Sequence, residues 1–371
     1  MKLLIVYGTR PEAIKMAPVV RAAQSDSRFE TVVCSSGQHR EMLDQVNDYF
    51  EIKPTVDLAL MQPGQTLSAL TAGCLTGLAS VVQEFQPDVV VGQGDTTTAM
   101  CSGLTAFYHQ LPFVHVEAGL RTSDIHSPFP EELNRRICSL TGALHCAPTS
   151  TAAGHLVREG YPDSDVAITG NTVIDALQWA VQKERSDGQQ WLKKYAQLGD
   201  HRMVLITAHR RENHGEGIRQ LCDAFADLSN RYPETEFVYP VHLNPEIRQP
   251  VHERLGSISN IHLVEPAGYA EFVWLMDRCH LILSDSGGVQ EEAPTLRKPV
   301  LVTRESTERP EALTAGATRL VGTAPDIVVA EASRLLDDPV AYQQMLVAEN
   351  PYGQGDAANR ILNLIADRWA Q

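Results

Sequence analysis

The feature that most restricts the fold of this 371-residue chain is a repeated alternation of short apolar runs with helical patterns. Runs such as Leu3–Tyr7 and Val89–Val91 have the length of buried strands, and helical stretches lie between them. Strands that alternate with helices are typical of parallel sheets, because a parallel connection needs a crossover that a helix provides. The alternation therefore predicts an α/β protein.

The apolar runs form two series, separated by the polar stretch from Lys183 to Asp200. Strands are expected near residues 2–7, 29–34, 88–92, 112–117, 143–147 and 165–168, and again near 202–207, 236–241, 261–264, 280–284, 299–302 and 318–321. Helices are expected near 11–23, 65–85, 95–109, 131–141 and 149–159 in the first series, and a last helix near 356–369. Pro18 is expected to kink or break the first of them.

Two such series in a chain of this length predict two Rossmann-like, doubly wound domains with the active site in the cleft between them. We expect the first domain to cover residues 1–168 and the second to cover 169–351. The C-terminal segment 352–371 is expected to pack back on the first domain.

Composition excludes several classes of function. The formal net charge of −15 argues against general binding to nucleic acid or to anionic membranes. The seven cysteines are scattered without a Cys-x-x-Cys pair, which indicates reduced, buried thiols, and the histidine spacing recommends no metal site. The longest uncharged stretch, Thr96–Val116, is too polar for a membrane span and is expected to form a buried helix followed by a buried strand. A cytoplasmic protein is the expectation.

The first strand runs into Gly-Thr-Arg-Pro-Glu-Ala-Ile-Lys, with Pro11 suited to the first position of a helix. Arg10 and Lys15 would then lie at the carboxyl end of a strand, where open α/β sheets bind ligands, and beside a helix N-terminus that favours anions. An ordinary strand-turn-helix with two surface cations explains the segment equally well.

Two acidic residues in the first half follow expected strands, and two more open an expected helix. Glu117 comes directly after a buried run and Asp95 follows the glycine turn that ends another, so they should lie at the same sheet edge on neighbouring strands. Glu131 and Glu132 open the helix after a proline-rich loop. Such a set favours acid–base chemistry or charge pairing. Alternatively, Asp95 caps a helix and either glutamate is a first-turn residue favoured by the helix dipole.

In the second half, cations and glycines follow the expected strands. His209, Arg210 and Arg211 come after one strand, which indicates a phosphate or leaving-group site in this acidic chain unless they form a solvated loop. Another strand turns through Ser286, Gly287 and Gly288 into a helix, where glycines let a phosphate approach the backbone.

Three further residues of the second half follow from the same pattern. Glu292 lies under two turns along the helix that the glycines open, from where a carboxylate can accept both ribose hydroxyls. Arg309 comes just after another strand. His242 also follows a strand and is as readily a packed loop histidine as a ligand.

Taken together, these segments strongly resemble the bacterial non-hydrolysing UDP-N-acetylglucosamine 2-epimerases. The matching stretches are GTRPEAIKMAP (8–18), GQHREMLDQV (37–46), MQPGQTL (61–67), GDTTT (94–98), HVEAGLRT (115–122), SPFPEELNR (127–135), ITGNTVIDAL (168–177), AHRREN (208–213), YPVHLNP (239–245), SDSGGVQEEAP (284–294), TERPEA (307–312) and NPYGQGDAANRI (350–361). They occur in family order and run nearly end to end.

The resemblance implies a fold similar to the glycosyltransferase-B group and the interconversion of UDP-GlcNAc and UDP-ManNAc without a cofactor. It implies a homodimer that serves cell-surface polysaccharide synthesis and binds a second UDP-GlcNAc as activator. The reaction expected of the family expels UDP from C1 as the C2–H bond breaks, which gives a 2-acetamidoglucal, and then re-adds UDP with protonation from the other face.

The family roles carry over onto matching positions of this chain. The implied catalytic residues are Asp95, Glu117, Glu131 and His209. The implied substrate-binding residues are Arg10, Lys15, Phe272 beside the uracil, Ser286, Gly287 and Gly288 at the pyrophosphate, Glu292 at the ribose, and Arg309. Gln38, His39, Gln65, Arg210 and His242 fall in segments that would line the activator site. Some relatives have glutamine where this chain has Ala267, so a base contact there must come from the backbone.

Other functions remain open on the sequence alone. A glycosyltransferase of the same fold would share the Ser-Gly-Gly turn but would not need the three carboxylates. Epimerases of UDP-2,3-diacetamido-glucuronate are close relatives, although Leu120-Arg121-Thr122 favours UDP-GlcNAc. A hydrolysing variant would release free ManNAc and UDP, and a sensor would bind UDP-GlcNAc without turning it over.

Overall fold

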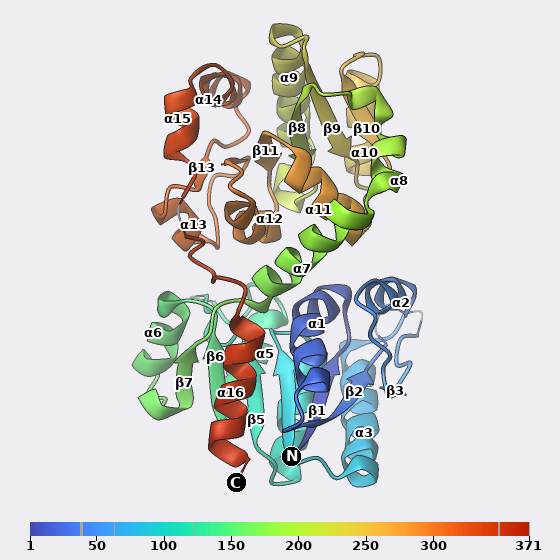
Figure 1. Cartoon of the computed structure of the whole chain (residues 1–371), viewed down its shortest axis with the longest axis vertical. Coiled ribbons are helices and arrows are strands. Elements are labelled where there is room, and N and C mark those ends of the chain that lie inside the picture. Colours follow the sequence, from blue (N-terminus) through green and yellow to red (C-terminus); the bar gives the residue numbers. More distant parts are fainter. Residues whose placement is uncertain (38–39, 63, 123, 348, 371) are drawn as a thin grey trace. The chain divides into compact units, whose positions relative to one another are not determined.

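The computed structural model describes residues 1–37, 40–62, 64–122, 124–347 and 349–370 (Figure 1). Its contacts divide the chain into two units, each built around a parallel sheet. Unit 1 comprises Met1–Ala176 with Tyr352–Gln371, and unit 2 comprises Leu177–Pro351.

Unit 1 contains a seven-stranded sheet in the order β3-β2-β1-β4-β5-β6-β7 among the described residues. Its strands are β1 (Lys2–Tyr7), β2 (Glu30–Ser35), β3 (Val56–Asp57), β4 (Val89–Gln93), β5 (Phe113–Val116), β6 (Leu144–Ala147) and β7 (Val166–Ile168). Its helices are α1 (Arg10–Ser25), α2 (Arg40–Tyr49), α3 (Leu67–Phe85), α4 (Thr97–Tyr108), α5 (Glu131–Thr141), α6 (Ser150–Arg158), the start of α7 (Thr172–Asp187) and α16 (Ala357–Trp369), with a 3₁₀ turn at Asp163–Asp165.

Unit 2 contains a six-stranded sheet in the order β10-β9-β8-β11-β12-β13 in the described part of the chain. Its strands are β8 (Arg202–Thr207), β9 (Thr235–Pro240), β10 (Ile261–Val264), β11 (Leu281–Ser284), β12 (Val300–Val302) and β13 (Thr318–Leu320). Besides the rest of α7, its helices are α8 (Gln189–Lys194), α9 (Glu216–Arg231), α10 (Pro245–Leu255), α11 (Tyr269–Arg278), α12 (Gly287–Glu292), α13 (Pro310–Thr314), α14 (Pro325–Asp337) and α15 (Pro339–Gln344), with 3₁₀ turns at Ala196–Leu198, Arg211–Asn213 and Ala293–Leu296.

The predicted α/β class with two doubly wound sheets is confirmed. Every strand pair is parallel, as between β1 and β4 or β8 and β11. In both sheets the strand order reverses at the first strand of the unit, so a topological switch point lies between β1 and β4 and another between β8 and β11. Ligands of such sheets bind outside the carboxyl ends of the strands at these points.

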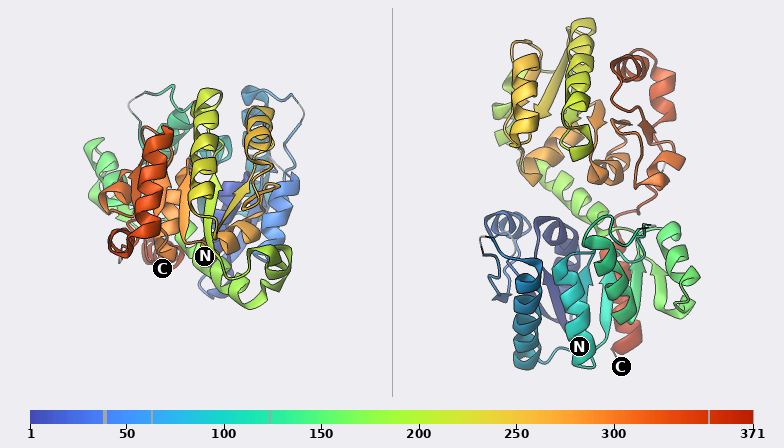
Figure 2. Two further views of the ribbon diagram at one scale, coloured as in Figure 1. Left: turned by 90° about the horizontal axis from the view of Figure 1, so that it is seen from above. Right: turned by 180° about the vertical axis from the view of Figure 1, so that it is seen from behind.

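Helices cover both faces of each sheet (Figures 1 and 2). In unit 1, α1 contacts α2 and α16, while α4 contacts α3 and α5. In unit 2, α9 contacts both α10 and α14. Strands β1, β4 and β8 are almost entirely buried, which explains why they read as continuous apolar runs in the sequence.

The structure departs from the sequence expectations in three places. The expected break at Pro18 is wrong, because α1 continues to Ser25, with Met16, Ala17, Val19 and Val20 buried around the proline. Strand β3 and helix α2 were not predicted; β3 has two residues and offers no periodic signal. The polar stretch 183–200 contains the end of α7, all of α8 and a 3₁₀ turn.

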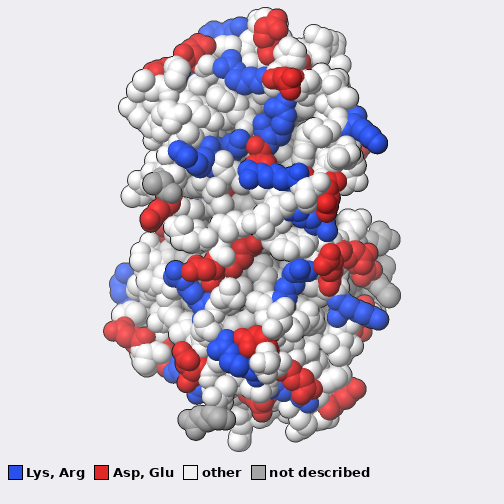
Figure 3. Space-filling model, viewed as in Figure 1, with Lys and Arg blue, Asp and Glu red and all other residues white. Residues whose placement is uncertain are grey.

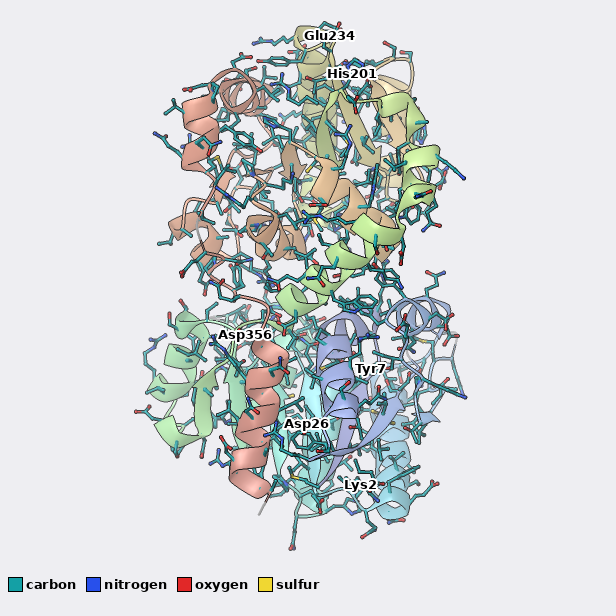
Figure 4. All side chains as sticks on the ribbon, viewed as in Figure 1. Lys2, Tyr7, Asp26, His201, Glu234 and Asp356 are labelled. Carbon is teal, nitrogen blue, oxygen red and sulfur yellow. The ribbon has the colours of Figure 1, made fainter. Side chains whose placement is uncertain are left out.

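Side-chain hydrogen bonds fasten the peripheral helices of unit 1. Asp175 accepts from the backbone N–H groups of Ala357 and Ala358 at 3.3 and 2.9 Å, at the start of α16, and burial raises its pKa to about 6. The hydroxyl of Tyr7 donates to Asn47 of α2 at 2.8 Å. Tyr7 and Asp356, which precedes α16, are labelled in Figure 4.

All seven cysteines are buried and unpaired, in agreement with the sequence expectation of reduced thiols. The segment 96–116 forms α4 followed by β5, as predicted. Among the described residues, none of the helices combines the length and the apolar character that crossing a bilayer requires. Basic and acidic side chains are interspersed over the face shown in Figure 3.

Candidate active site

The carboxyl ends of β4 and β5 bring two predicted carboxylates to one edge of the unit 1 sheet. Gln93 and Val116 are paired in the sheet, and the N–H of Gly94 donates to the carbonyl of Val116 at 2.9 Å. Nε2 of His115 lies 2.8 Å from the Gly94 carbonyl oxygen, and burial lowers the pKa of His115 to about 3, so the neutral ring donates this bond. Asp95 and Glu117 therefore leave adjacent strand ends in fixed turns.

Glu117 sits in a strained turn and is held from three sides. Its φ of 62° is in the left-handed region, which is uncommon for a residue with a side chain and concentrates at functional sites. The carboxylate is 5% exposed and accepts two bonds from Nζ of Lys15 at 2.7 and 2.6 Å. The side-chain amides of Gln93 and Asn171 also donate to it, the latter at 3.4 Å.

The turn after Glu117 requires a glycine. Gly119 has a φ of 90°, and a Cβ at this position would lie 2.2 Å from the carbonyl oxygen of Ala152. No side chain fits there. The close approach of α6 therefore contributes to the turn that presents Glu117.

Asp95 does not cap α4, so that alternative is wrong. The N-cap is Thr96, whose hydroxyl accepts from Ala99 N at 3.0 Å. The Asp95 carboxylate instead forms a two-point ion pair with Arg135 of α5, at 2.9 Å to Nε and 2.8 Å to Nη2. The side chain of Asn134 donates to the Asp95 carbonyl oxygen at 2.8 Å.

Helix α5 separates the roles of its two leading glutamates. Glu132 is fully buried and pairs with Arg135 at 3.2 Å and Arg136 at 3.0 Å, while it accepts from Thr122 N at 3.1 Å. Glu131 is half-buried and forms no hydrogen bond or ion pair with any described residue. It lies one turn before the two α5 side chains that bind Asp95, on the same face of the helix. Glu131, and not Glu132, is thus available to a ligand near Asp95.

The turn between β1 and α1 adds cations at the same sheet edge. Arg10 is the first residue of α1, and Lys15 lies farther along that helix. Gly8 is packed so closely that a Cβ would lie 2.0 Å from Oγ of Ser36 and 2.4 Å from Oγ1 of Thr98. This close packing fixes the start of α1 against its neighbours.

In unit 2, a buried aspartate organises the turn that carries His209. Oδ2 of Asp285 accepts from the backbone N–H groups of His209 and Arg210, both at 2.8 Å, and from Nδ2 of Asn213 at 3.1 Å. Its Oδ1 lies 3.2 Å from Nδ1 of His209. Burial lowers the pKa of His209, and the negative charge of Asp285 acts in the opposite direction.

Four of the predicted residues line one pocket of unit 2, with a volume of about 180 Å³. The lining residues are Thr207, Ala208, His209, Pro240, His242, Pro266, Ala267, Phe272 and Ser286. The rings of His209 and His242 are stacked, with centroids 5.9 Å apart. Pockets for whole drug-sized ligands span roughly 300–1,000 Å³. This one fits a single ring system.

Two guanidinium groups flank the glycine turn at the start of α12. A Cβ on Gly287 would lie 3.5 Å from Nη2 of Arg210 and 3.9 Å from Cζ of Arg309. Nε of Arg210 is buried without a hydrogen-bond partner among the described residues. The carboxylate of Glu292 folds back toward the turn, since its Oε2 would lie 3.9 Å from a Cβ on Gly288. Two arginines beside a glycine turn suit a phosphate group.

Comparison with known proteins assigns a family to this arrangement. The family model described as UDP-N-acetylglucosamine 2-epimerase matches residues 21–366. The chain is 51% identical to the UDP-N-acetylglucosamine 2-epimerase of Escherichia coli K12 over 369 residues, which covers 98% of each protein. The chain belongs to the UDP-N-acetylglucosamine 2-epimerase family.

Solved structures agree with this membership. The UDP-GlcNAc 2-epimerase of Neisseria meningitidis bound to UDP-GlcNAc is similar with a TM-score of 0.91 and 46% identity, covering 99% of this chain and 100% of that one. The enzyme of Methanocaldococcus jannaschii in complex with UDP-GlcNAc and UDP is similar with a TM-score of 0.81 and 30% identity, at the same coverage.

The five residues expected to line an activator site are divided between the two units. Gln38 and His39 lie outside the described residues. Gln65 precedes α3, and its side-chain oxygen accepts from Gln62 N at 3.4 Å. Arg210 and His242 instead accompany the glycine turn and the His209 pocket of unit 2.

Two buried carboxylates of the site were missed by the sequence reasoning. Glu12 is 2% exposed and forms a capping box with Thr9 at the start of α1. It also accepts from the hydroxyl of Thr96 at 2.6 Å, so it ties the β1–α1 turn to the residue after Asp95. The Thr-x-x-Glu spacing at the helix start is the signal that predicts such a box. Asp285 ends a buried apolar run, which marks a strand end but not a partner.

Glu12 predicts a specific dependence of stability on pH. Burial raises its pKa from 4.5 to about 7. The folded protein therefore holds this proton more tightly than the unfolded chain does, and stability decreases as the pH rises from 4.5 to 7. Glu12→Gln, which resembles the protonated form, is expected to gain about 3 kcal/mol relative to wild type between pH 5 and pH 8. Melting temperatures at both pH values measure this difference.

Glu30→Gln, at the exposed first residue of β2, serves as the matched control for that experiment. It should show the same pH dependence of melting as wild type. A Glu12→Gln variant with an unchanged pH dependence would show that the proton is not held at this carboxylate.

Proposed function

We propose that this protein interconverts UDP-GlcNAc and UDP-ManNAc by reversible inversion at C2 of the sugar. Support comes from the family membership and from one structural observation. The observation is that Glu117, buried against Lys15, leaves the sheet beside Asp95. Glu131, which has no ion pair or hydrogen bond among the described residues, lies one helical turn from the side chains that bind Asp95. Proton transfer at carbon requires acid–base groups, which these carboxylates can supply, and binding alone needs none of them.

The proposed reaction avoids an inaccessible carbanion. The C2 proton of UDP-GlcNAc is not adjacent to a carbonyl group, so simple deprotonation would leave an unstabilised charge. When the C2–H bond breaks together with the C1–O bond, its electron pair forms the C1–C2 double bond and UDP leaves with the C1–O pair. Re-addition of UDP to this 2-acetamidoglucal, with protonation on the opposite face of C2, gives the epimer.

The residues of each unit are assigned distinct roles. Asp95, Glu117 and Glu131 are proposed as the acid–base groups at C2, with Arg10 and Lys15 as nearby cations. A second set, in unit 2, is proposed to bind the UDP moiety: His209, Phe272, Ser286, Gly287, Gly288, Glu292 and Arg309. The pocket beside Phe272 suits a uracil ring, and the arginines at Gly287 suit the diphosphate.

Further properties are proposed on the resemblance to the family. These are a homodimer, activation by a second UDP-GlcNAc molecule, a cytoplasmic location and a role in supplying precursors for cell-surface polysaccharides. The chemistry as written consumes no cofactor.

The function is tested by proton NMR of the purified protein with UDP-GlcNAc in D₂O, without added cofactor or metal. Deuterium at C2 in a mixture of UDP-GlcNAc and UDP-ManNAc is the expected result. Free ManNAc with UDP would instead identify the hydrolysing reaction. Substrate that binds and stays unchanged would favour a glycosyltransferase that awaits its acceptor, or a sensor.

A prediction for UDP binding follows from Glu292. Replacing it by alanine removes the carboxylate proposed to accept the ribose hydroxyls. Hydrogen bonds to a charged group contribute about 1.5–3 kcal/mol, so the Kd for UDP should rise by about 10- to 150-fold in titration calorimetry. Asp277→Asn, which removes a surface ion pair with Arg185 in the same unit, is the control. Unchanged UDP affinity in the Glu292 variant would overturn its ribose role.

A further inference from the structure

Asp285 accepts three hydrogen bonds from the turn that carries His209. The carboxylate is fully buried. Three donors converge on one of its oxygens, Oδ2: the N–H groups of His209 and Arg210 and the amide of Asn213. The other oxygen, Oδ1, is buried and has no fully formed hydrogen bond among the described residues. Its neighbour is Nδ1 of His209, at 3.2 Å.

The cost of burying a charged oxygen determines which nitrogen of His209 carries the hydrogen next to Asp285. A buried carboxylate oxygen without a donor costs free energy, and an N–H aimed at it removes the cost. The neutral imidazole has one N–H, which can be on Nδ1 or on Nε2. A hydrogen on Nδ1 would face Oδ1 of Asp285 across the 3.2 Å contact and reduce that cost, whereas a hydrogen on Nε2 would turn the Nδ1 lone pair toward a negative oxygen.

We infer that Asp285 is a positioning residue that fixes the hydrogen of His209 on Nδ1 and thereby directs Nε2 to the ligand. The inference rests on the proposed function for the role of His209 beside the UDP leaving group. In the protonated ring, Nε2–H donates to the departing diphosphate while Nδ1–H stays on Asp285. In the neutral ring, Nε2 is left as an acceptor. The charge of Asp285 favours the protonated ring at the moment when negative charge develops on the leaving group.

The groups around His209 set its response to pH. Asp285, after β11, raises the pKa of the ring, while Arg210 in the same turn and His242 after β9 lower it, in addition to burial. Without the charge of Asp285, burial and the charges of Arg210 and His242 remain, and all of them lower the pKa of His209. The protonated fraction of His209 should therefore decline at a lower pH in the variant than in wild type.

The Asp285→Asn variant tests this inference because its amide has a defined orientation. The three donors that converge on Oδ2 keep the amide oxygen at that position, so the amide NH₂ faces Nδ1. An NH₂ donor there requires Nδ1 to accept, which moves the ring hydrogen to Nε2. The tautomer of His209 is read from ¹H–¹⁵N correlations of ¹⁵N-histidine-labelled protein, with the His209 signals assigned by their loss in His209→Gln.

We expect the Nδ1–H tautomer in wild type and the Nε2–H tautomer in Asp285→Asn. The kcat for epimerisation should fall by about 10²–10⁴-fold and its alkaline-side pH limb should move to lower pH, with UDP affinity changed less than about threefold. Asn213→Ala is the control for the turn, because Asn213 bonds Asp285 and the Thr303 carbonyl but not the ring. It should lower the melting temperature and leave the tautomer and the pH limb unchanged.

Two outcomes would overturn the inference. One is a wild-type His209 with its hydrogen on Nε2, a result that needs no folded variant. The other is an Asn213→Ala variant that loses activity to the same extent and with the same pH shift as Asp285→Asn. Wild-type protein that leaves UDP-GlcNAc unchanged would instead contradict the proposed function, while the tautomer measurement would still decide the role of Asp285.

Discussion

Replacing Glu117 by glutamine is expected to slow the interconversion of UDP-GlcNAc and UDP-ManNAc by about 10²–10⁴-fold, the contribution typical of an acid–base group. Glutamine keeps the shape of the side chain but can neither take nor return a proton. The same range is expected for Asp95→Asn. The rate is measured by NMR as the approach to equilibrium from either sugar nucleotide.

The controls for Glu117→Gln separate chemistry from folding. UDP affinity should be retained, because the groups proposed to bind UDP belong to unit 2. Glu51→Gln, which removes a surface ion pair with Arg21 at 3.2 Å in the same unit, should leave the rate unchanged. The substitution at Glu117 also leaves Lys15 without its carboxylate, so a lower melting temperature is expected. A wild-type rate in Glu117→Gln would remove this residue from the mechanism.

The neighbouring pair Glu131 and Glu132 gives the second prediction, in which one substitution separates activity from stability. Glu131→Gln should slow epimerisation by about 10²–10⁴-fold without a change in melting temperature, because Glu131 has no ion pair to lose among the described residues. Glu132→Gln should destabilise the protein by about 1.5–3 kcal/mol, because it removes the buried charged acceptor that Arg135 and Arg136 share, while these arginines keep Asp95 and Glu159 as partners.

Both variants are compared in thermal denaturation and in the epimerisation assay at a temperature where each is folded. If the two variants lost activity and stability to the same extent, the distinction drawn from their contacts would be wrong. A Glu132→Gln variant that is stable but catalytically impaired would indicate that Glu132, and not Glu131, takes part in catalysis.

The strands were predictable because a parallel strand covered on both faces is a continuous apolar run that ends in glycine or a polar residue. The same fact made the candidate site predictable in outline. Residues that directly follow such runs, including Asp95, Glu117 and His209, come to the carboxyl edge of a sheet whatever the helices do. The two-residue β3 and the continuation of α1 through Pro18 were not predictable, since tertiary packing and not local sequence decides them.

The contacts that hold the candidate site together could not be predicted from the sequence. The bond between Asp285 and His209 joins residues 76 positions apart, and the ion pair of Arg135 with Asp95 joins residues 40 apart. The identity of such partners depends on strand order and on the direction in which each turn leaves the sheet. The sequence alone supplies one exception, Glu12, whose capping-box spacing is local.

The hydrogen bond between Asn171 and Tyr352 has a consequence for synthesis on the ribosome. Unit 2 is continuous from Leu177 to Pro351, so it can fold as soon as it emerges. Unit 1 gains its last contacts only after residues 352–371 have been made, because Asn171 N donates to Tyr352 O at 2.7 Å and Asp175 binds the start of α16. Asn171 also donates to Glu117, so in a nascent chain the unit proposed to bind UDP is complete before the partners of Glu117 are all in place.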